Sequence, residues 1–381
     1  MNEITELLSE MSDIAQNPDM RLAACLAEGR KAVGVFPYYV PEEIAYAAGF
    51  VPFGIWGMQG SVREAGRYFP AFYCTVARMG LELALSGKID KLSAVIMPSV
   101  CDTLRPFSQN FKSARPDIPM VFLAHPQNRK EDFGIAYTVC EYRRVKAELE
   151  GIAGVKITDE SLADAICVYN ENRAARREFV RLAGLYPSTV SALRRAEVLK
   201  SAYFMDKSEH TRLLLRINAA LCALPHDPQP GVKVVTSGII ADNANLLDIF
   251  DRYGITVAAD DVAHESRSFR VDTPIKSGDP LTALARQFSE QSDDPLLYEP
   301  DLDRRGRRLV DLVLNCGARG VIFIMMQFCD PEELDYPNIK KTLDRASVPS
   351  VMIGYDQQMR DFGQAGTSLE AFSDMLRTRL Q

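Results

Sequence analysis

The chain has 381 residues, of which 47% are hydrophobic and 25% charged, a composition typical of globular proteins and unlike that of disordered or fibrous chains. It carries 44 Lys and Arg against 51 Asp and Glu, a net charge of −7 with both signs interspersed. We therefore expect no nucleic-acid-binding surface and no basic membrane-binding face. No apolar stretch reaches the roughly 18 residues that span a bilayer, and the acidic first residues do not resemble a signal peptide. We expect a cytoplasmic protein.

Residues 1–30 are predicted to form an N-terminal helical segment that ends near Gly29. In the next segment, residues 31–139, short apolar runs alternate with helical patterns. Its predicted strands are residues 33–36, 51–56, 94–97 and 120–123, and its predicted helices are residues 41–49 and 75–86. This alternation is typical of a doubly wound parallel sheet, because parallel strands need helical crossovers between them.

Residues 140–230 are predicted to be a helical connection, with helices at residues 162–183 and 189–204 and a turn-rich end. The alternating pattern returns in residues 231–381. Strands are predicted at residues 232–236, 256–259, 320–326 and 351–354, and helices at residues 245–253, 304–316, 340–345 and 367–380. We therefore predict an α/β fold of two doubly wound parallel-sheet lobes, joined by a helical segment and separated by a cleft.

Two of the eight cysteines stand where ligands bind in such folds, beyond the carboxyl ends of strands, and a third stands at the start of a helix. Cys101 follows the strand at residues 94–97, and Cys329 takes the matching place in the second lobe; an aspartate follows each. Cys74 directly precedes a helix, whose free N–H groups favour a thiolate. We predict that these three cysteines bind a metal centre, the alternative being that they are free thiols packed in the core. The other five fit packing better, at positions 25, 140, 167, 222 and 316.

Three thiolates indicate a particular kind of metal centre. A structural zinc site uses four protein ligands, so three would leave it incomplete. A cubane iron–sulfur cluster can be held by three thiolates, with its fourth iron open to a small ligand or to substrate. The four histidines show no metal-binding spacing, and Asp260 and Asp261, at the end of a strand, are expected in a solvated loop.

Five segments carry a resemblance to the 2-hydroxyacyl-CoA dehydratase family, which includes subunits of benzoyl-CoA reductase. They are PEEIAYAAG at residues 41–49, FGIWG at 53–57, VCDTLRPFSQNFK at 100–112, QFCDP at 327–331 and GQAGTSLEAF at 363–372. The chain most resembles the β subunit of the heterodimeric enzymes. It departs from the family at Ser368, where a basic residue is usual.

The resemblance implies that Cys74, Cys101 and Cys329 hold one [4Fe–4S] cluster. It implies a homologous α subunit, and a separate ATP-hydrolysing iron–sulfur activator that injects one electron. The substrate would be an (R)-2-hydroxyacyl-CoA, which loses water through a ketyl radical, and a flavin (FMN) in the complex is left open. Glu43 matches an acidic position of the family and Tyr38 precedes it, so both are candidates to face the cleft; helix-end charge stabilisation and packing are their alternative roles.

Two other functions stay open at this point. One is a benzoyl-CoA reductase type of enzyme, or a homodimeric reductase with a double-cubane cluster. The other is no enzyme at all: a two-lobed small-molecule binding protein whose cysteines are structural.

Overall fold

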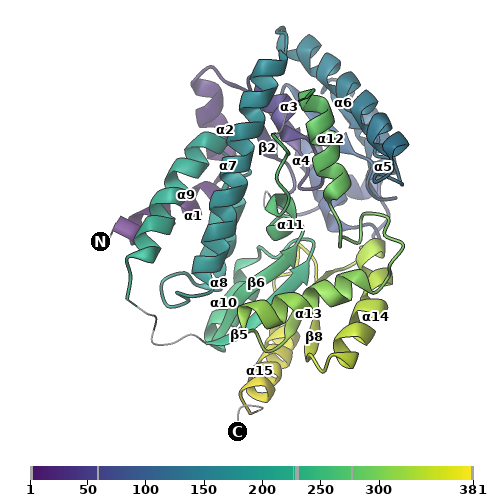
Figure 1. Ribbon diagram of the computed structural model, residues 1–381. Coiled ribbons are helices and arrows are strands. Elements are labelled where there is room, and N and C mark those ends of the chain that lie inside the picture. Colours follow the sequence, from purple (N-terminus) through teal and green to yellow (C-terminus); the bar gives the residue numbers. More distant parts are fainter. Residues whose placement is uncertain (1–2, 58–59, 226, 228–230, 276–277, 379–381) are drawn as a thin grey trace.

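The computed structural model describes residues 3–57, 60–225, 227, 231–275 and 278–378. The described residues form two four-stranded parallel sheets with helices packed around them (Figure 1). In spatial order the first sheet consists of β2 (Phe50–Gly54), β1 (Lys31–Val35), β3 (Ala94–Pro98) and β4 (Met120–Leu123). Its inner strands are buried along almost their whole length because helices cover both faces, which explains their continuous apolar sequences.

The second sheet has the same kind of order. Its strands are β6 (Ile255–Val262), β5 (Val232–Gly238), β7 (Val321–Met326) and β8 (Ser350–Tyr355). In each sheet the chain starts on an inner strand, adds one neighbour, and then crosses to the other side. This reversal makes a topological switch point at the carboxyl ends of the inner strands, where ligands bind in open α/β sheets. The α/β fold of two lobes is therefore confirmed.

Helices connect the strands within each lobe. The first lobe contains α3 (Glu42–Ala47), a short 3-10 turn (Ala65–Arg67), α4 (Thr75–Leu85) and α5 (Leu104–Ala114). Around the second sheet lie α10 (Ala244–Arg252), α11 (Ser266–Phe269), α12 (Pro280–Glu290), α13 (Arg304–Cys316), α14 (Asp330–Arg345) and α15 (Gly363–Thr378). One of these helices leaves its own sheet, since α12 packs beside α6 (Asp132–Ala153) of the helical segment (Figure 1).

The middle of the chain is helical, as predicted. It consists of α6 (Asp132–Ala153), α7 (Asp159–Ala183), α8 (Ala192–Ser201) and α9 (Lys207–Cys222). The N-terminal helices α1 (Glu3–Gln16) and α2 (Pro18–Ala27) are separated at Asn17, because Pro18 starts a new helix. The apolar side of α1 packs on α8 and α9 and shares their core. No helix among the described residues is both long and apolar enough to cross a membrane.

One helix differs clearly from its prediction. The pattern predicted a helix only over residues 340–345, whereas α14 begins ten residues earlier, at Asp330. Pro331 lies in its first turn, where proline is favoured, and three acidic residues there suit the positive end of the helix. Pro337 lies inside the same helix and misled the prediction, since a proline within a helical pattern usually marks a boundary.

Candidate metal centre

The structure brings Cys74, Cys101 and Cys329 to one small cavity between the two lobes. Each lies where a helix begins: Cys74 is the N-cap of α4, Cys101 lies in the turn before α5, and Cys329 is the N-cap of α14. Two of these helices follow inner strands of different sheets, β3 and β7, whose carboxyl ends face the cleft. Side chains 255 residues apart in the sequence (329 − 74) therefore line the same space.

Main-chain N–H groups lie near all three sulfur atoms and lower the pKa of each thiol, although neither Cys74 nor Cys329 makes a side-chain hydrogen bond that caps its helix. The groups that lower the pKa belong to Val76 and Ala77 at Cys74, to Thr103 and Leu104 at Cys101, and to Glu332 at Cys329. These contacts are a consequence of the three helix starts, whose first N–H groups have no partner within the helix. They stabilise negative charge on sulfur, as does the positive end of each helix dipole.

Burial acts in the opposite direction and is stronger. It raises the pKa of Cys74 to about 12, and it raises the pKa of Cys101 and, more strongly, that of Cys329. Cys101 also raises the pKa of Cys74, and Cys74 and Cys101 raise the pKa of Cys329, because each thiolate disfavours a second one nearby. The thiolate form at neutral pH therefore requires a positively charged partner in the cavity, which is what a metal centre provides.

The chemistry of the donor set is compatible with an iron–sulfur cluster. Within the described ranges, no three His, Cys, Asp or Glu side chains are close enough together to hold one metal ion. In a cubane cluster each thiolate binds a different iron, so its ligands stand farther apart than those of a mononuclear site. Three thiols from both lobes, each supported by main-chain N–H groups, are compatible with such a cluster.

Tyr38 and Glu43, the two other predicted residues, lie in different surroundings. Tyr38 follows β1 and lines the cysteine cavity; burial and the three nearby sulfurs raise its pKa well above the usual value. Glu43 is buried in the first turn of α3, but it pairs with Arg173 of α7 and does not line the cysteine cavity. It lines a second cavity, to which Tyr38 also contributes.

The other cysteines do not all match their prediction. Packing in the core was expected for Cys140, Cys167 and Cys222, and this was wrong, because all three are exposed. Cys167 follows the buried Ile166 but faces out, and Cys140 lies on α6 near two exposed aromatic residues, Phe133 and Tyr137. Among the histidines, His226 lies outside the described residues, and the other three are buried (His125, His210 and His264).

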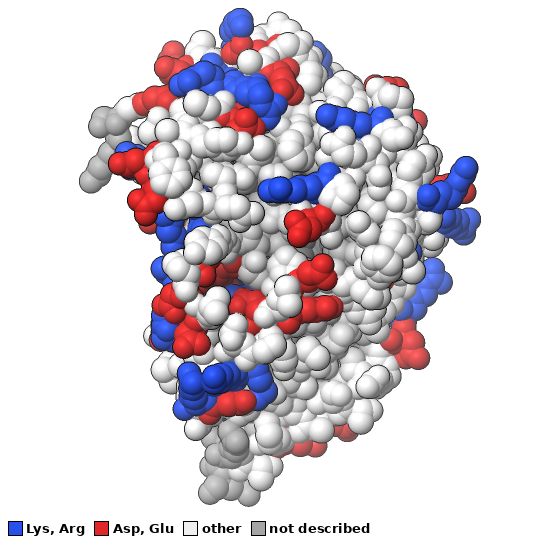
Figure 2. All heavy atoms as spheres, turned by 90° about the vertical axis from the view of Figure 1, so that its right-hand side faces the viewer, with Lys and Arg blue, Asp and Glu red and all other residues white. Residues whose placement is uncertain are grey.

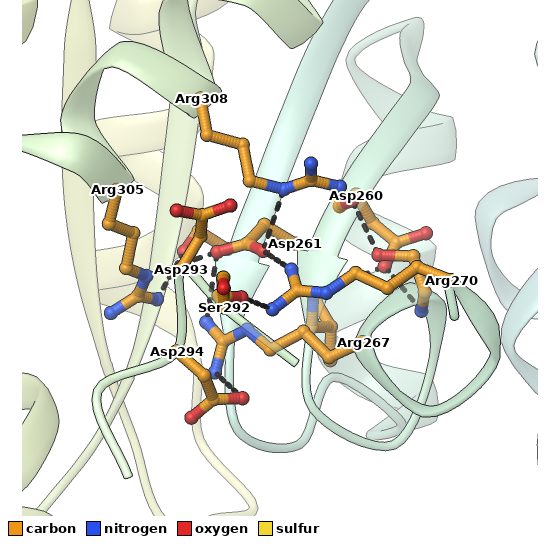
Figure 3. A network of polar contacts seen from close by, with 12 residues as sticks. Asp260, Asp261, Arg267, Arg270, Ser292, Asp293, Asp294, Arg305 and Arg308 are labelled. Carbon is orange, nitrogen blue, oxygen red and sulfur yellow. Dashed lines mark hydrogen bonds and ion pairs between the residues drawn. The ribbon is translucent and has the colours of Figure 1, made fainter. Parts of the chain in front are cut away.

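Asp260 and Asp261 are also placed differently from the prediction of a solvated loop. Both belong to β6, and both are buried. Asp260 pairs with Arg195, and Asp261 lies within 4 Å of four arginines (Figure 3). The network connects β6 to α11, to the loop at residues 292–294 and to α13, and so holds the walls of the cleft together.

Sequence reasoning missed a group of buried polar and charged residues on α7. Tyr169, Arg173 and Arg176 continue the stripe that Leu162 and Ile166 begin, at the three- and four-residue spacing of one helix face. Charged residues at positions expected to be apolar could have revealed them.

On the molecular surface, acidic and basic side chains are mixed on the face shown in Figure 2, and a broad area of this face carries no charged residue.

The fold and the site define a class of protein: two α/β lobes with three cysteines, each at the start of a helix, in the cleft between them. Comparison with known proteins gives the family. Residues 37–376 match the family described as 2-hydroxyglutaryl-CoA dehydratase, D-component, and the chain belongs to this family. The resemblance seen in the sequence is thereby confirmed.

Relatives cover nearly the whole chain. It is 48% identical to the β subunit of (R)-2-hydroxyglutaryl-CoA dehydratase from Acidaminococcus fermentans, over 98% of the chain and 100% of the relative. It is 41% identical to the β subunit of lactoyl-CoA dehydratase from Anaerotignum propionicum, over 99% and 100%. A benzoyl-CoA reductase subunit from Thauera aromatica is 28% identical, over 91% of each chain. The chain is thus a β-type subunit of the 2-hydroxyacyl-CoA dehydratase family.

Proposed function

We propose that this chain is one subunit of a hydro-lyase that removes water from an (R)-2-hydroxyacyl-CoA. The observation that carries the proposal is the convergence of Cys74, Cys101 and Cys329 in one cavity. The relatives support the reaction class, because those with 40–48% identity are named as β subunits of dehydratases acting on 2-hydroxyacyl-CoA thioesters.

Cys74, Cys101 and Cys329 would hold a [4Fe–4S] cluster, which supplies one-electron chemistry when bound. The residues of this chain hold the sulfurs and shield the site. Main-chain N–H groups stabilise the thiolates, as described above. The buried Tyr38 and the partly buried Leu296 are part of the cavity wall and reduce the access of water to it.

The overall reaction explains why an electron is needed. The hydrogen at C3 of an acyl-CoA is too weakly acidic for a side-chain base. One electron added to the thioester carbonyl gives a ketyl radical anion, which expels the 2-hydroxyl group as hydroxide. The resulting radical loses its C3 proton far more readily, and the electron then returns to the enzyme. An ATP-hydrolysing activator protein would supply the first electron, and this chain's part would be to store or relay it.

A homologous α subunit is the second proposed partner. Exposed apolar side chains lie around the cysteine cavity: Phe328 is 41% exposed at its edge, and Leu302 and Leu334 are 62% and 77% exposed in the adjoining cleft beside Cys101. Apolar groups at the mouth of a site favour coverage by another protein. A subunit bound there would close the cavity and place its own substrate site close to these cysteines.

Iron content tests the proposal most directly. The chain is purified without oxygen, together with its partner subunit, and iron and sulfide are measured per chain. We expect Cys101→Ala to lose most of the iron bound by this subunit, while Cys140→Ala, an exposed cysteine on α6, keeps it. A colourless, iron-free wild-type protein, or equal iron in both variants, would remove the proposal. Fluorescence of heat-released flavin shows in the same sample whether FMN is present.

The benzoyl-CoA reductase type of reaction is the second candidate, favoured by the 28% identity to one subunit of such an enzyme. Activity separates the two. With an activator and ATP, we expect dehydration of 2-hydroxyacyl-CoA substrates and no reduction of an aromatic acyl-CoA. The native mass distinguishes a pair with an α subunit from a homodimer.

A further inference from the structure

A second cavity has Tyr38 in its wall, as the cysteine cavity does. Its volume is about 80 Å³, whereas one water molecule needs roughly 10–15 Å³ measured in this way. Its walls come from the segment after β1 and from helices of both the first lobe and the helical segment, chiefly α3, α6 and α7. Parts of α11 and α12 close it from the second lobe. The cavity is therefore large enough for several waters or for one small organic molecule.

Most charged groups in its walls are already paired. Glu43 pairs with Arg173, and the Glu42 carboxylate lies 3.1 Å from the Lys207 ammonium. Asp294 accepts a hydrogen bond of 2.6 Å from the Tyr39 hydroxyl and lies 3.7 Å from an Arg267 nitrogen. These pairs leave no carboxylate over for a further cation.

Arg176 is the cation in the cavity wall that has no carboxylate in contact with it. Its side chain is only 4% exposed, and among the described residues no carboxylate oxygen lies within 4 Å of it. The groups in contact with it are neutral: an Nη2 atom donates to the main-chain oxygen of His264 at 3.3 Å, the guanidinium lies 4.4 Å from the ring centre of Phe269, and Nε has no partner. Arg176 also lowers the pKa of Glu265, but that carboxylate is paired with Arg195. A buried charge without a counterion is costly, so an anion in the cavity would be stabilised here.

Two phenol groups in the same walls also lack partners. Tyr38 is 6% exposed and Tyr142 is 2% exposed, and within the described part of the chain neither hydroxyl makes a hydrogen bond. Buried tyrosine hydroxyls usually have a partner. One unpaired guanidinium and two unpaired hydroxyl donors around one cavity form a site for an acceptor with a negative charge.

We propose that this cavity binds a small monocarboxylate of about two to four carbon atoms, with Arg176 as its counterion and a tyrosine hydroxyl as a second donor. The planar guanidinium matches the two oxygens of a carboxylate. A single excess positive charge fits a monoanion better than a phosphate dianion. The aromatic rings of Phe36 and Phe288 in the walls suit a short apolar tail. No part of the proposal depends on the metal centre.

Thermal unfolding tests it, because a ligand that binds only the folded state raises the melting temperature. The full chain, purified with its partner subunit, is titrated with acetate, propionate and lactate at constant ionic strength, and with acetamide as the uncharged probe. We expect a saturable rise in Tm with at least one carboxylate and none with acetamide. Calorimetric titration of the same samples gives the dissociation constant.

Variants connect the effect to the cavity. We expect Arg176→Gln to weaken carboxylate binding at least tenfold, while Arg181→Gln, an exposed arginine on the same helix, leaves it unchanged. If the first variant does not fold, Tyr142→Phe removes one donor with little change of shape and is expected to weaken binding several-fold. Unchanged affinity in Arg176→Gln, or stabilisation by phosphate but by no carboxylate, would overturn the proposal. Because these measurements do not involve iron or activity, they stand or fall separately from the dehydratase assignment.

Discussion

Asp261 is the residue whose replacement most directly tests how the cleft is held together. Its carboxylate lies 3.1 Å from Arg267, 3.2 Å from Arg270, 3.1 Å from Arg305 and 3.9 Å from Arg308 (Figure 3). The arginines come from α11, from the residue after it and from α13. Asp261→Asn keeps the shape of the side chain and removes its charge. The variant therefore leaves several cations facing one another without their common anion.

The expected cost follows from burial. Asp261 is 0% exposed, and the side chains of Arg267 and Arg305 are 1% and 6% exposed, so water does not screen these charges. Removing one partner of a buried ion pair costs about 3–5 kcal/mol. Glu332, 3.7 Å from Arg267 and 3.5 Å from Arg305, offsets part of the loss. We expect a decrease of about 3 kcal/mol or more, against the roughly 5–15 kcal/mol by which folded proteins are usually stable.

Urea unfolding of the two proteins at several pH values measures the decrease. The surrounding arginines hold the pKa of Asp261 far below its usual value. Its stabilising effect is therefore fully present above the unfolded-state pKa of about 3.9, and is lost only as the pH falls toward the folded-state pKa. The difference between wild type and variant should thus be constant from pH 5 to 8. Asp374→Asn, with a 70% exposed side chain, is the control. A loss below about 1 kcal/mol, or one that varies across this range, would refute the reasoning.

Three further predictions concern other parts of the chain. Burial lowers the pKa of His210 to about 3, so as the pH falls the unfolded chain takes up a proton at this residue before the folded protein does. The free energy of unfolding therefore decreases below pH 6.5, by about 1.4 kcal/mol per pH unit. In urea titrations at pH 7 and 5, His210→Gln should reduce this decrease. Gly134→Ala should lower Tm, because its Cβ would overlap the main-chain oxygen of Asn128, whereas Gly151→Ala on the same helix has open space and should not. Glu82→Ala removes an acceptor that holds two main-chain N–H groups before α4, and limited proteolysis there should become faster.

Each of these three predictions has a result that would contradict it. The histidine argument fails if wild type and variant lose stability in parallel between pH 7 and 5. Equal melting temperatures of the two glycine variants would show that the chain near residue 128 yields without cost. Unchanged cleavage of the segment at residues 60–74 would mean that Glu82 does not order it.

The sequence alone located every strand of the two sheets, although β6 continues three residues beyond its predicted end. Buried parallel strands are continuous apolar runs, and this local signal placed residues 120–123 at the observed bounds of β4 and residues 94–97 within one residue of β3. It also placed Cys101 and Cys329 beyond strand ends, because the alternation of strands and helices already implies which ends lie together. The family followed from contiguous motifs such as VCDTLRPF, which need no structure to be read.

The tertiary structure decided which residues meet and which side of each helix faces water. Cys140 belongs to an apolar helical stretch and is nevertheless exposed, since only packing against neighbours decides how a helix is rotated. Asp261 and Arg305 are 44 residues apart, and Tyr38 and Arg176 are 138 apart, yet each pair shares one buried site. Apolar periodicity reports the local conformation of the backbone, whereas the pairing of buried charges depends on how distant elements dock, and this information is not contained in any short stretch of sequence.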